Sequence, residues 1–211
     1  MTDELIFYTN PMSRGQIVRW MLEEVGEPYD TRVIDFASGL NSADYLAVNP
    51  MGKVPAIRHG GRIVTEGAAI IAYLADVFPA ADLAPRDDEK ADYYRWMFYA
   101  AGPVEQAVTN NAMGFVPTAE QQRMAGYGSY DRVVDVLDNL IAGRDFVCGD
   151  RFTACDVYLG SQVMWGIGFG TLPKRPSFEA YAARLGTRDA YRRGKEIDNG
   201  LIAEMKAASP V

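Results

Sequence analysis

Histidine and cysteine, which often carry nucleophilic and metal chemistry, are nearly absent from this sequence. His59 is the only histidine, so a Ser/His/Asp triad would have to use it and a metal site would lack a second imidazole. Cys148 and Cys155 are the only cysteines and form no CxxC pair. We therefore expect no bound metal, and the absence of a cysteine near residues 8–16 argues against a thioredoxin-like thiol-disulfide oxidoreductase.

Long apolar runs and an excess of basic residues are missing too. No segment reaches the roughly 20 apolar residues that span a bilayer, and no basic leader opens the chain. We therefore expect a cytoplasmic protein with no membrane partner. The sequence has 21 Lys and Arg but 28 Asp and Glu, which gives a net charge of −7. An acidic surface repels the phosphate backbone of nucleic acids. We expect no nucleic acid partner.

The composition is that of a globular protein with one large core or two small ones. Of the 211 residues, 48% are hydrophobic and 23% are charged. Strand and helix signals alternate up to residue 78, whereas nearly everything after Pro79 has helical periodicity. We predict an α/β domain over 1–78, a linker over 79–88 and an all-α domain over 89–211.

The N-terminal part predicts the order β-α-β, connector, β-β-α. A helix that ends at Gly26 connects the first two strands, which must therefore be parallel. Gly60 and Gly61 indicate a hairpin between the last two strands. This mixed sheet is the thioredoxin-like arrangement, although the order alone fits other small α/β domains. The predicted strands are 5–8, 29–36, 56–58 and 62–64, and the helix after the hairpin is 66–78.

The helical part contains one strong start signal. Thr153 stands three residues before Asp156, which is the spacing of a capping box. Phe152 and Val157 are placed to form the hydrophobic staple that accompanies such a box. The segment predicts a helix start with a structural cap worth roughly 1 kcal/mol.

Three segments of the N-terminal part offer donors to an anionic, peptide-like ligand. The first is NPMSRG, in which Ser13 lies between the first strand and the first helix. A hydroxyl at a helix start can donate to a thiolate, whose charge the helix dipole also favours. Two interpretations stay open, because serine at this position also caps helices.

The second segment is NPMGKVPAI. A cis bond before Pro55 would leave the backbone N–H and C=O of Val54 free to bind a short peptide as an added strand. Lys53 would then meet a carboxylate, or it is an ordinary exposed ammonium.

The third segment is TEGAAIIAYL, where Glu66 and Gly67 open a helix. The free N–H groups of the first turn can hold a carboxylate while Glu66 accepts from an ammonium, so an amino acid head group fits. The alternative is that Glu66 merely complements the helix dipole.

Taken in order, NPMSRG, NPMGKVPAI, TEGAAIIAYLAD and FVCGDRFTACDVYLG resemble the motifs of bacterial glutathione S-transferases, and the resemblance covers almost the whole chain. It implies a thioredoxin-like N-terminal domain that binds glutathione as co-substrate and an all-helical C-terminal domain for a small hydrophobic electrophile. It also implies a homodimer with a role in detoxification.

The resemblance assigns roles to individual residues. Ser13 matches the activating serine of the theta-like and delta-like classes. Pro55 matches the cis proline, and Val54 matches the backbone partner of the cysteinyl group. Lys53 would face the glycyl carboxylate, and Glu66 would hold the γ-glutamyl end.

Gly67 is a departure, because the family usually has serine there. Glycine keeps the backbone N–H but removes a hydroxyl donor, at a cost of about 0.5 to 1.5 kcal/mol of binding unless water or Thr65 replaces it. Tyr8 is a second candidate for activation, ranked below Ser13 because it lies in an apolar strand.

The site for the hydrophobic substrate is expected on both domains. Phe98, Gly102 and Glu105 are spaced along one helical face, which is either a binding face or a core stripe. Pro11 and Met12 would complete the site.

The sequence thus predicts a glutathione transferase that stabilises the thiolate for attack on a hydrophobic electrophile. Two alternatives remain: a binding or regulatory module with little turnover, for which Gly67 is the best support, and a glutathione-dependent peroxidase, reductase, lyase or isomerase using the same site.

Overall fold

The computed structural model describes residues 4–208 of the chain. The chain divides into two compact units. The first, which we call the sheet unit, is Met1–Asp82 with Arg188–Val211, and the second, the helical unit, is Leu83–Thr187. The division at 79–88 expected from the sequence stays a prediction; the structure adds that the last helix belongs to the sheet unit.

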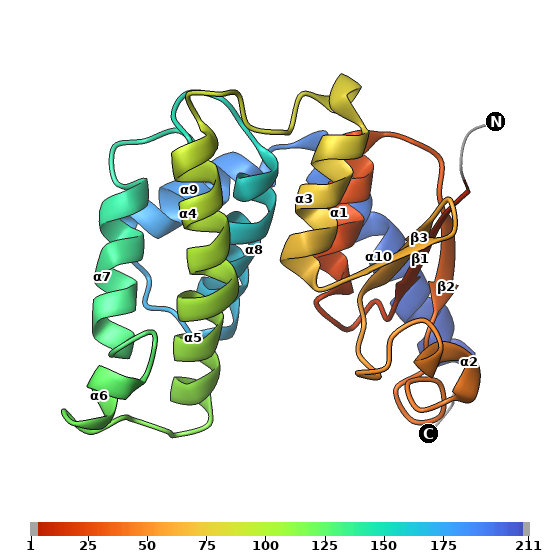
Figure 1. The fold of residues 1–211 in the computed structure, drawn as a ribbon, viewed down its shortest axis with the longest axis horizontal. Coiled ribbons are helices and arrows are strands. Elements are labelled where there is room, and N and C mark those ends of the chain that lie inside the picture. Colours follow the sequence, from red (N-terminus) through yellow and green to blue (C-terminus); the bar gives the residue numbers. More distant parts are fainter. Residues whose placement is uncertain (1–3, 209–211) are drawn as a thin grey trace. The chain divides into compact units, whose positions relative to one another are not determined.

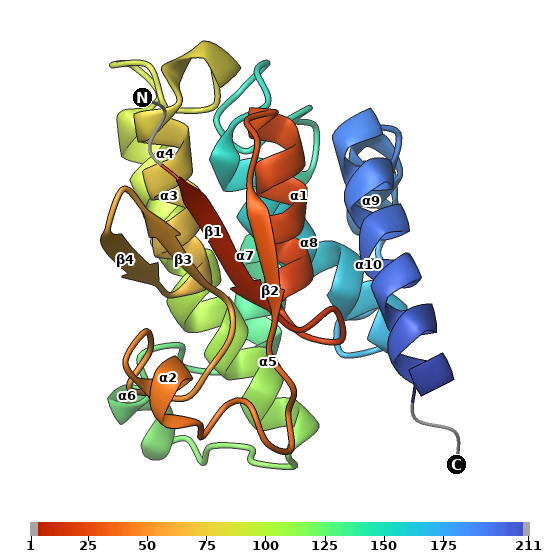
Figure 2. The same cartoon turned by 90° about the vertical axis from the view of Figure 1, so that its right-hand side faces the viewer.

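The sheet unit contains a four-stranded mixed sheet in the order β2-β1-β3-β4 (Figure 2). β1 pairs with β2 in parallel and with β3 antiparallel, and β3 and β4 form a hairpin, so the predicted thioredoxin-like arrangement is confirmed. Helices α1 and α3 lie on the same side of this sheet (Figure 1). The elements are β1 (Leu5–Thr9), α1 (Gly15–Val25), β2 (Asp30–Val33), α2 (Ala43–Leu46), β3 (Ala56–His59), β4 (Arg62–Thr65), α3 (Gly67–Val77), η1 (Pro79–Ala81) and α10 (Asp189–Ala208).

Two turns of this unit follow from the local sequence. Gly26 ends α1 with a left-handed φ of 76°, and its N–H donates to the Leu22 carbonyl. The strand predicted over 29–36 is shorter, because the Asp35 carboxylate accepts the N–H of Ala37 and of Ser38 and turns the chain after Val33. The hydrogen bond from the Ser38 hydroxyl, together with these two from backbone N–H groups, lowers the pKa of Asp35.

α10 is held on α1 by buried and half-buried polar contacts. Arg19 and Asp198 form an ion pair at 3.2 Å, and both side chains are 1% exposed. Arg188 donates to the Glu24 carboxylate at 2.5 and 2.7 Å, at the other end of the same contact. Burial raises the pKa of Asp198 although the neighbouring Arg19 guanidinium acts to lower it.

The most extensively buried helix of the helical unit is α8, and side chains of α4, α7 and α9 also contribute to the core. α4, η2 and α5 follow one another without a break, and Pro103, which has no N–H, lies in the π-helical turn η2. The elements are α4 (Lys90–Tyr99), η2 (Ala100–Val104), α5 (Glu105–Ala112), α6 (Gln121–Met124), α7 (Tyr130–Ile141), α8 (Ala154–Phe169) and α9 (Pro176–Gly186).

The predicted capping box at the start of α8 is confirmed. The Asp156 carboxylate accepts the N–H of Thr153 at 2.9 Å and also the N–H of Val147 and the hydroxyl of Tyr181. Phe152 and Val157, the expected staple pair, are both buried. The box thus joins the α8 start to the preceding loop and to α9.

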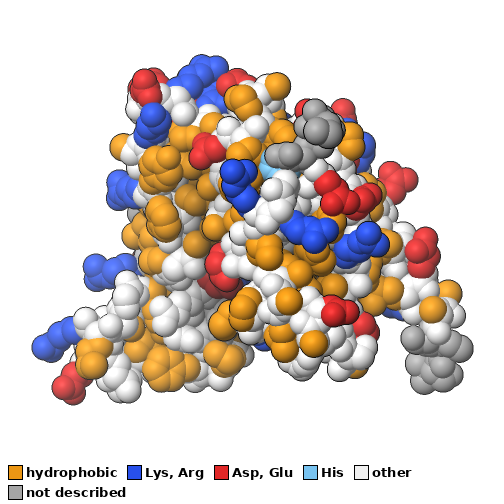
Figure 3. Space-filling view, turned by 45° about the vertical axis from the view of Figure 1, so that its right-hand side comes forward, with side chains coloured by type: hydrophobic (Ala, Val, Ile, Leu, Met, Phe, Trp, Pro, Cys, Tyr) orange, Lys and Arg blue, Asp and Glu red, His pale blue; other side chains and the backbone are white. Residues whose placement is uncertain are grey.

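The visible surface mixes charge and apolar groups. On the face shown in Figure 3, basic side chains lie among acidic and hydrophobic ones. Within residues 4–208, no helix combines the length and the apolar character needed to cross a membrane.

Candidate functional site

The strand register brings the three predicted segments to one end of the sheet. Tyr8 pairs with Ala56, and Ala56 pairs with Thr65. The chain runs from that row into the Ser13 loop after β1, arrives through Val54 and Pro55 before β3, and leaves through Glu66 after β4. The three segments are therefore neighbours in space although far apart in the sequence.

Ser13 lies in a tight loop before α1 and is half-buried. Its hydroxyl donates to the Asn10 carbonyl at 2.6 Å and accepts the N–H of Gly15 at 2.9 Å. The same Asn10 carbonyl accepts the N–H of Ser13 at 3.0 Å. Ser13 thus satisfies the N–H of the first residue of α1, although Arg14 is the N-cap, and its position before an 11-residue helix also suits donation to an anion.

Val54 has backbone groups available for a ligand. The Val54–Pro55 peptide bond is cis, as the resemblance implies. Among the described residues, no hydrogen-bond partner occupies the N–H or the C=O of Val54. An extended ligand with its own N–H and C=O can pair with both. Lys53 is exposed, which leaves its ammonium free to reach a carboxylate.

Two side chains from the α2 region fix this segment. The Tyr45 hydroxyl donates to the Lys53 carbonyl at 2.6 Å, and the Asn49 amide donates to the same oxygen at 2.7 Å. Burial raises the pKa of Tyr45 to about 12, so this hydroxyl stays protonated and remains a donor at neutral pH. Both residues therefore position the backbone that precedes Val54.

Glu66 and Gly67 form the start of α3. Glu66 is exposed and has φ 66° and ψ 117°, a region that a non-glycine residue enters at a cost of about 1 to 3 kcal/mol. The first helical hydrogen bond of α3 runs from the N–H of Ile70 to the carbonyl of Glu66. The N–H groups before Ile70 therefore have no acceptor within the helix. Gly67 starts the helix with an ordinary backbone conformation, and strain does not explain the glycine there.

Sequence reasoning missed the role of two Asn-Pro pairs. Asn10 and Asn49 each accept the N–H of the methionine two residues later, at 2.9 and 3.1 Å. The side-chain amide of Asn10 also donates to the Ile34 carbonyl at 2.9 Å. The repeated letters NPM were the available signal, since asparagine before proline favours such turns.

Tyr8, the second candidate for activation, is half-buried at the same end of the sheet. Its ring lies against the Tyr45 ring, with centroids 6.0 Å apart. This packing explains a tyrosine in β1 without a catalytic role, and Ser13 remains the better candidate.

The residues expected to contact the hydrophobic substrate lie in both units. In the sheet unit, Met12 is 52% exposed and Pro11 is buried. In the helical unit, Phe98 is 70% exposed, so it belongs to a surface and not to a core stripe. Glu105 accepts from the Tyr158 hydroxyl and the Gln162 amide at 3.2 and 3.3 Å, and a side chain at Gly102 would meet open space.

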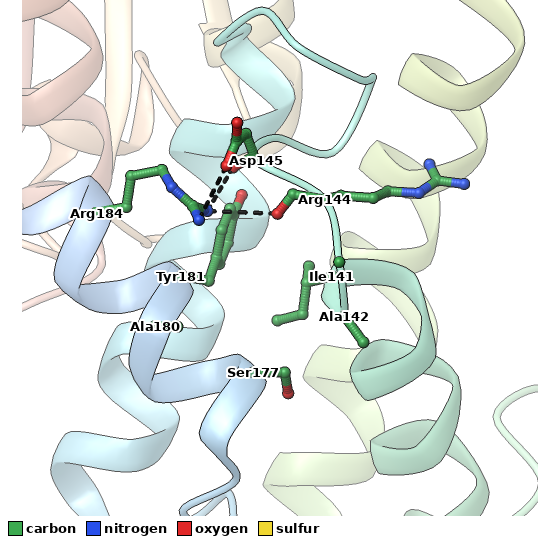
Figure 4. Close-up of a pocket in the computed structure, with 9 residues that line it drawn as sticks. Ile141, Ala142, Arg144, Asp145, Ser177, Ala180, Tyr181 and Arg184 are labelled. Atoms are coloured by element: carbon green, nitrogen blue, oxygen red, sulfur yellow. Dashed lines mark hydrogen bonds and ion pairs between the residues drawn. The ribbon is translucent and has the colours of Figure 1, made fainter.

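Two cavities, one in each unit, are lined by none of the predicted site residues. One, of about 400 Å³, is lined by Leu5 and His59 at the opposite end of the sheet. The other, of about 450 Å³, lies in the helical unit between α7, α9 and the loop that joins α7 to α8 (Figure 4). Its Arg184 is already paired with Asp145 at 3.0 Å and its Tyr181 with Asp156 at 2.7 Å.

The chain resembles known proteins over most of its length. A family model described as "Glutathione S-transferase, N-terminal domain" matches residues 12–77. The chain is 31% identical over 173 residues to Glutathione S-transferase GstA of Escherichia coli O157:H7, covering 78% of this chain and 80% of that protein. It is 28% identical over 225 residues to Disulfide-bond oxidoreductase YghU of Escherichia coli K12, covering 95% and 77%.

Solved structures of glutathione S-transferases have a fold similar to that of this chain. A theta class glutathione S-transferase from Xanthomonas axonopodis pv. citri, with glutathione bound, has a TM-score of 0.72 at 28% identity and covers 92% of this chain and 97% of its own. A sphingomonad glutathione S-transferase complexed with glutathione has a TM-score of 0.74 at 26% identity, covering 92% and 98%. By sequence and by fold, the chain belongs to the glutathione S-transferase family.

Proposed function

We propose that this enzyme holds glutathione at the end of the sheet where Ser13, Val54 and Glu66 meet, and joins glutathione through its sulfur to a hydrophobic electrophile. The observation that carries the proposal is the pairing of Tyr8, Ala56 and Thr65 in one row, which brings the three segments together. The unpartnered backbone of Val54 fits the cysteinyl part of a tripeptide, and the first turn of α3 fits its amino acid end.

Ser13 can turn its hydroxyl hydrogen bond from the Asn10 carbonyl to a thiolate at little cost. The Asn10 carbonyl accepts two hydrogen bonds from Ser13, one from the hydroxyl and one from the N–H. When the hydroxyl turns to a ligand, the carbonyl therefore keeps one donor and is not left unsatisfied. Donation to sulfur, with the positive end of the α1 dipole, stabilises the thiolate and lowers the thiol pKa.

The reaction is a nucleophilic substitution or addition in which the protein supplies activation and positioning. The thiol proton leaves to solvent, the thiolate sulfur forms a bond to an electrophilic carbon, and any leaving group departs with its electron pair. Lys53 and Glu66 hold the two charged ends of the tripeptide, and Gly67 contributes a backbone N–H without the usual hydroxyl.

The electrophile is proposed to be apolar. The proposal rests on exposed apolar side chains, Met12 of the sheet unit and Phe98 of the helical unit, each in its own unit. Pro11, Gly102 and Glu105 stay proposed members of this site. We also propose a homodimer in the cytoplasm with a role in detoxification; sedimentation of the purified protein tests the dimer.

Ser13→Ala tests the role of the hydroxyl. We expect the thiol pKa of bound glutathione, followed by thiolate absorbance, to lie below the free value of about 8.5 in the wild type and to rise in the variant. Loss of a hydrogen bond to a charged group should lower kcat at pH 7 roughly tenfold to a hundredfold for an activated chloronitrobenzene.

Ser129→Ala is the matched control, because Ser129 also caps a helix start and lies in the helical unit. This variant should leave the thiol pKa and kcat unchanged. If glutathione binds to the wild type while its thiol keeps the free pKa, the protein is a binding or regulatory module and the proposal is wrong.

A second candidate is glutathione-dependent reduction of a disulfide at the same site, favoured by the 28% identity to a protein named as a disulfide-bond oxidoreductase. Two glutathione molecules would reduce one small disulfide to two thiols and become glutathione disulfide. A coupled assay for glutathione disulfide, run beside the conjugation assay, distinguishes the two reactions.

A further inference from the structure

Thr9 carries a buried hydroxyl without a partner. Thr9 is the last residue of β1 and its side chain is 0% exposed. Among the described residues, no group forms a hydrogen bond with its hydroxyl oxygen. An unsatisfied buried hydroxyl destabilises the folded state, so it calls for an explanation.

Strand pairing does not require this hydroxyl. The Thr9 backbone pairs with Val33 of β2, and its carbonyl accepts the N–H of Ile34 at 2.7 Å. Valine has nearly the same shape, favours strands equally and would avoid the buried polar atom. The fold alone therefore gives no reason for threonine at this position.

The Thr9 and Ser13 hydroxyls face the same small space beside α1. A Cβ atom placed on Gly15 would lie 2.0 Å from Thr9 Oγ1 and 3.0 Å from Ser13 Oγ. Because position 15 has no side chain, there is room for the Thr9 hydroxyl beside the Ser13 hydroxyl. The proposed activating serine is thus a polar neighbour of the orphan hydroxyl.

Ser13 has one acceptor position to spare. A hydroxyl has one hydrogen and two lone pairs. In the structure the hydrogen of Ser13 goes to the Asn10 carbonyl and one lone pair takes the Gly15 N–H. A second lone pair is left, and a hydroxyl that receives a hydrogen bond becomes a stronger donor through its own hydrogen.

We propose that Thr9 is a positioning residue for catalysis: its hydroxyl donates to Ser13 Oγ when the Ser13 hydrogen turns from the Asn10 carbonyl to the glutathione sulfur. We call this pair of hydrogen bonds, from Thr9 to Ser13 and from Ser13 to sulfur, the relay. It gives the Thr9 hydroxyl a partner in the liganded state and strengthens the Ser13 hydroxyl as a donor to the thiolate. It rests on the proposed function, since it needs Ser13 to donate to sulfur.

Thr9→Val in the full-length protein tests the relay, with the thiol pKa of bound glutathione as the main readout. The variant should raise this pKa by roughly half a pH unit to one pH unit and lower kcat about threefold to tenfold. The free energy of unfolding without glutathione should stay equal or increase. Thr9→Ser, which keeps the hydroxyl, should retain the wild-type pKa even if losing the methyl group reduces stability.

Thr31→Val is the matched control. Thr31 lies on the neighbouring strand, and its hydroxyl accepts from Arg19 at 2.8 Å. Its loss should reduce stability without moving the pH profile of conjugation.

The double variant Thr9→Val with Ser13→Ala separates this proposal from the proposed function. Thr9→Val should raise the thiol pKa when Ser13 is present and have no effect on it when Ser13 is replaced by alanine. An unchanged pKa in the single Thr9→Val variant, or an equal rise in both backgrounds, overturns the relay while leaving the role of Ser13 intact. An unchanged pKa in Ser13→Ala alone overturns both.

Discussion

The hydroxyl of Ser13 has a role in the fold that does not exclude its proposed role in the chemistry. In the structure it closes the loop before α1 through the Asn10 carbonyl and the Gly15 N–H. If the hydroxyl turns away, neither group is left without a partner. The Asn10 carbonyl still accepts the N–H of Ser13, and the Gly15 N–H can donate to a bound anion. The capping interpretation and the catalytic interpretation of this serine are therefore compatible.

Gly67 is a position where one added hydroxyl should improve binding. Its backbone is the ordinary first position of a helix, so serine can be introduced without strain. Gly67→Ser should restore the donor usual in the family and tighten glutathione binding by about 0.5 to 1.5 kcal/mol, or roughly twofold to tenfold in Kd. Calorimetric titration measures this change.

Gly67→Ala is the control for the Gly67→Ser variant, since alanine adds the Cβ and the helix propensity of a side chain but no donor. Equal tightening in both variants would show that rigidity, and not the hydroxyl, was missing. No tightening in either would show that water or Thr65 already supplies the donor.

The sequence predicted the proposed ligand-binding residues from local motifs, whereas the proposed role of Thr9 depends on contacts across the fold. Ser13, Val54 and Glu66 follow from short patterns that place a donor or a free backbone beside a turn. Thr9 looks like any strand threonine, because its burial and its approach to Gly15 depend on how α1 packs on β1. No local pattern contains that information.

At the scale of elements, α10 was the least predictable part. Its periodicity indicates a helix but not its packing partner, since a buried Arg19–Asp198 pair links residues 179 positions apart. Arg19 also lies over the Phe7 ring, with its guanidinium 4.9 Å from the centroid. An arginine inside an apolar helix face was the one available sign that a charged partner had to come from elsewhere.

Asp198→Asn tests how much the buried pair contributes. Without the carboxylate charge, Arg19 remains buried and unpaired in charge, so the free energy of unfolding should fall by about 3 to 5 kcal/mol in a urea titration. Asp189→Asn is the control, because Asp189 starts the same helix but is 86% exposed, and its exposed pair with Arg192 should contribute little. A loss below about 1 kcal/mol for Asp198→Asn would contradict this account.

At the scale of the whole molecule, the chain leaves the sheet unit at Asp82 and returns to it at Arg188. The sheet unit is therefore discontinuous, and a cut between the two predicted domains would separate α1 from α10. Trp20 of α1 is 2% exposed and packs against Tyr191, with ring centroids 5.1 Å apart. Without α10 this apolar face would be open to water.

A chain of residues 1–82 alone should consequently be unstable or aggregate, whereas 1–82 joined to 188–211 through a flexible Gly/Ser linker should fold. Circular dichroism and urea unfolding of the two chains test this, and the joined chain should show a cooperative transition that the short chain lacks. Equal transitions in both would show that the sheet with α1 and α3 is self-sufficient. The contact of α10 would then be an addition to the sheet unit and not a condition of its folding.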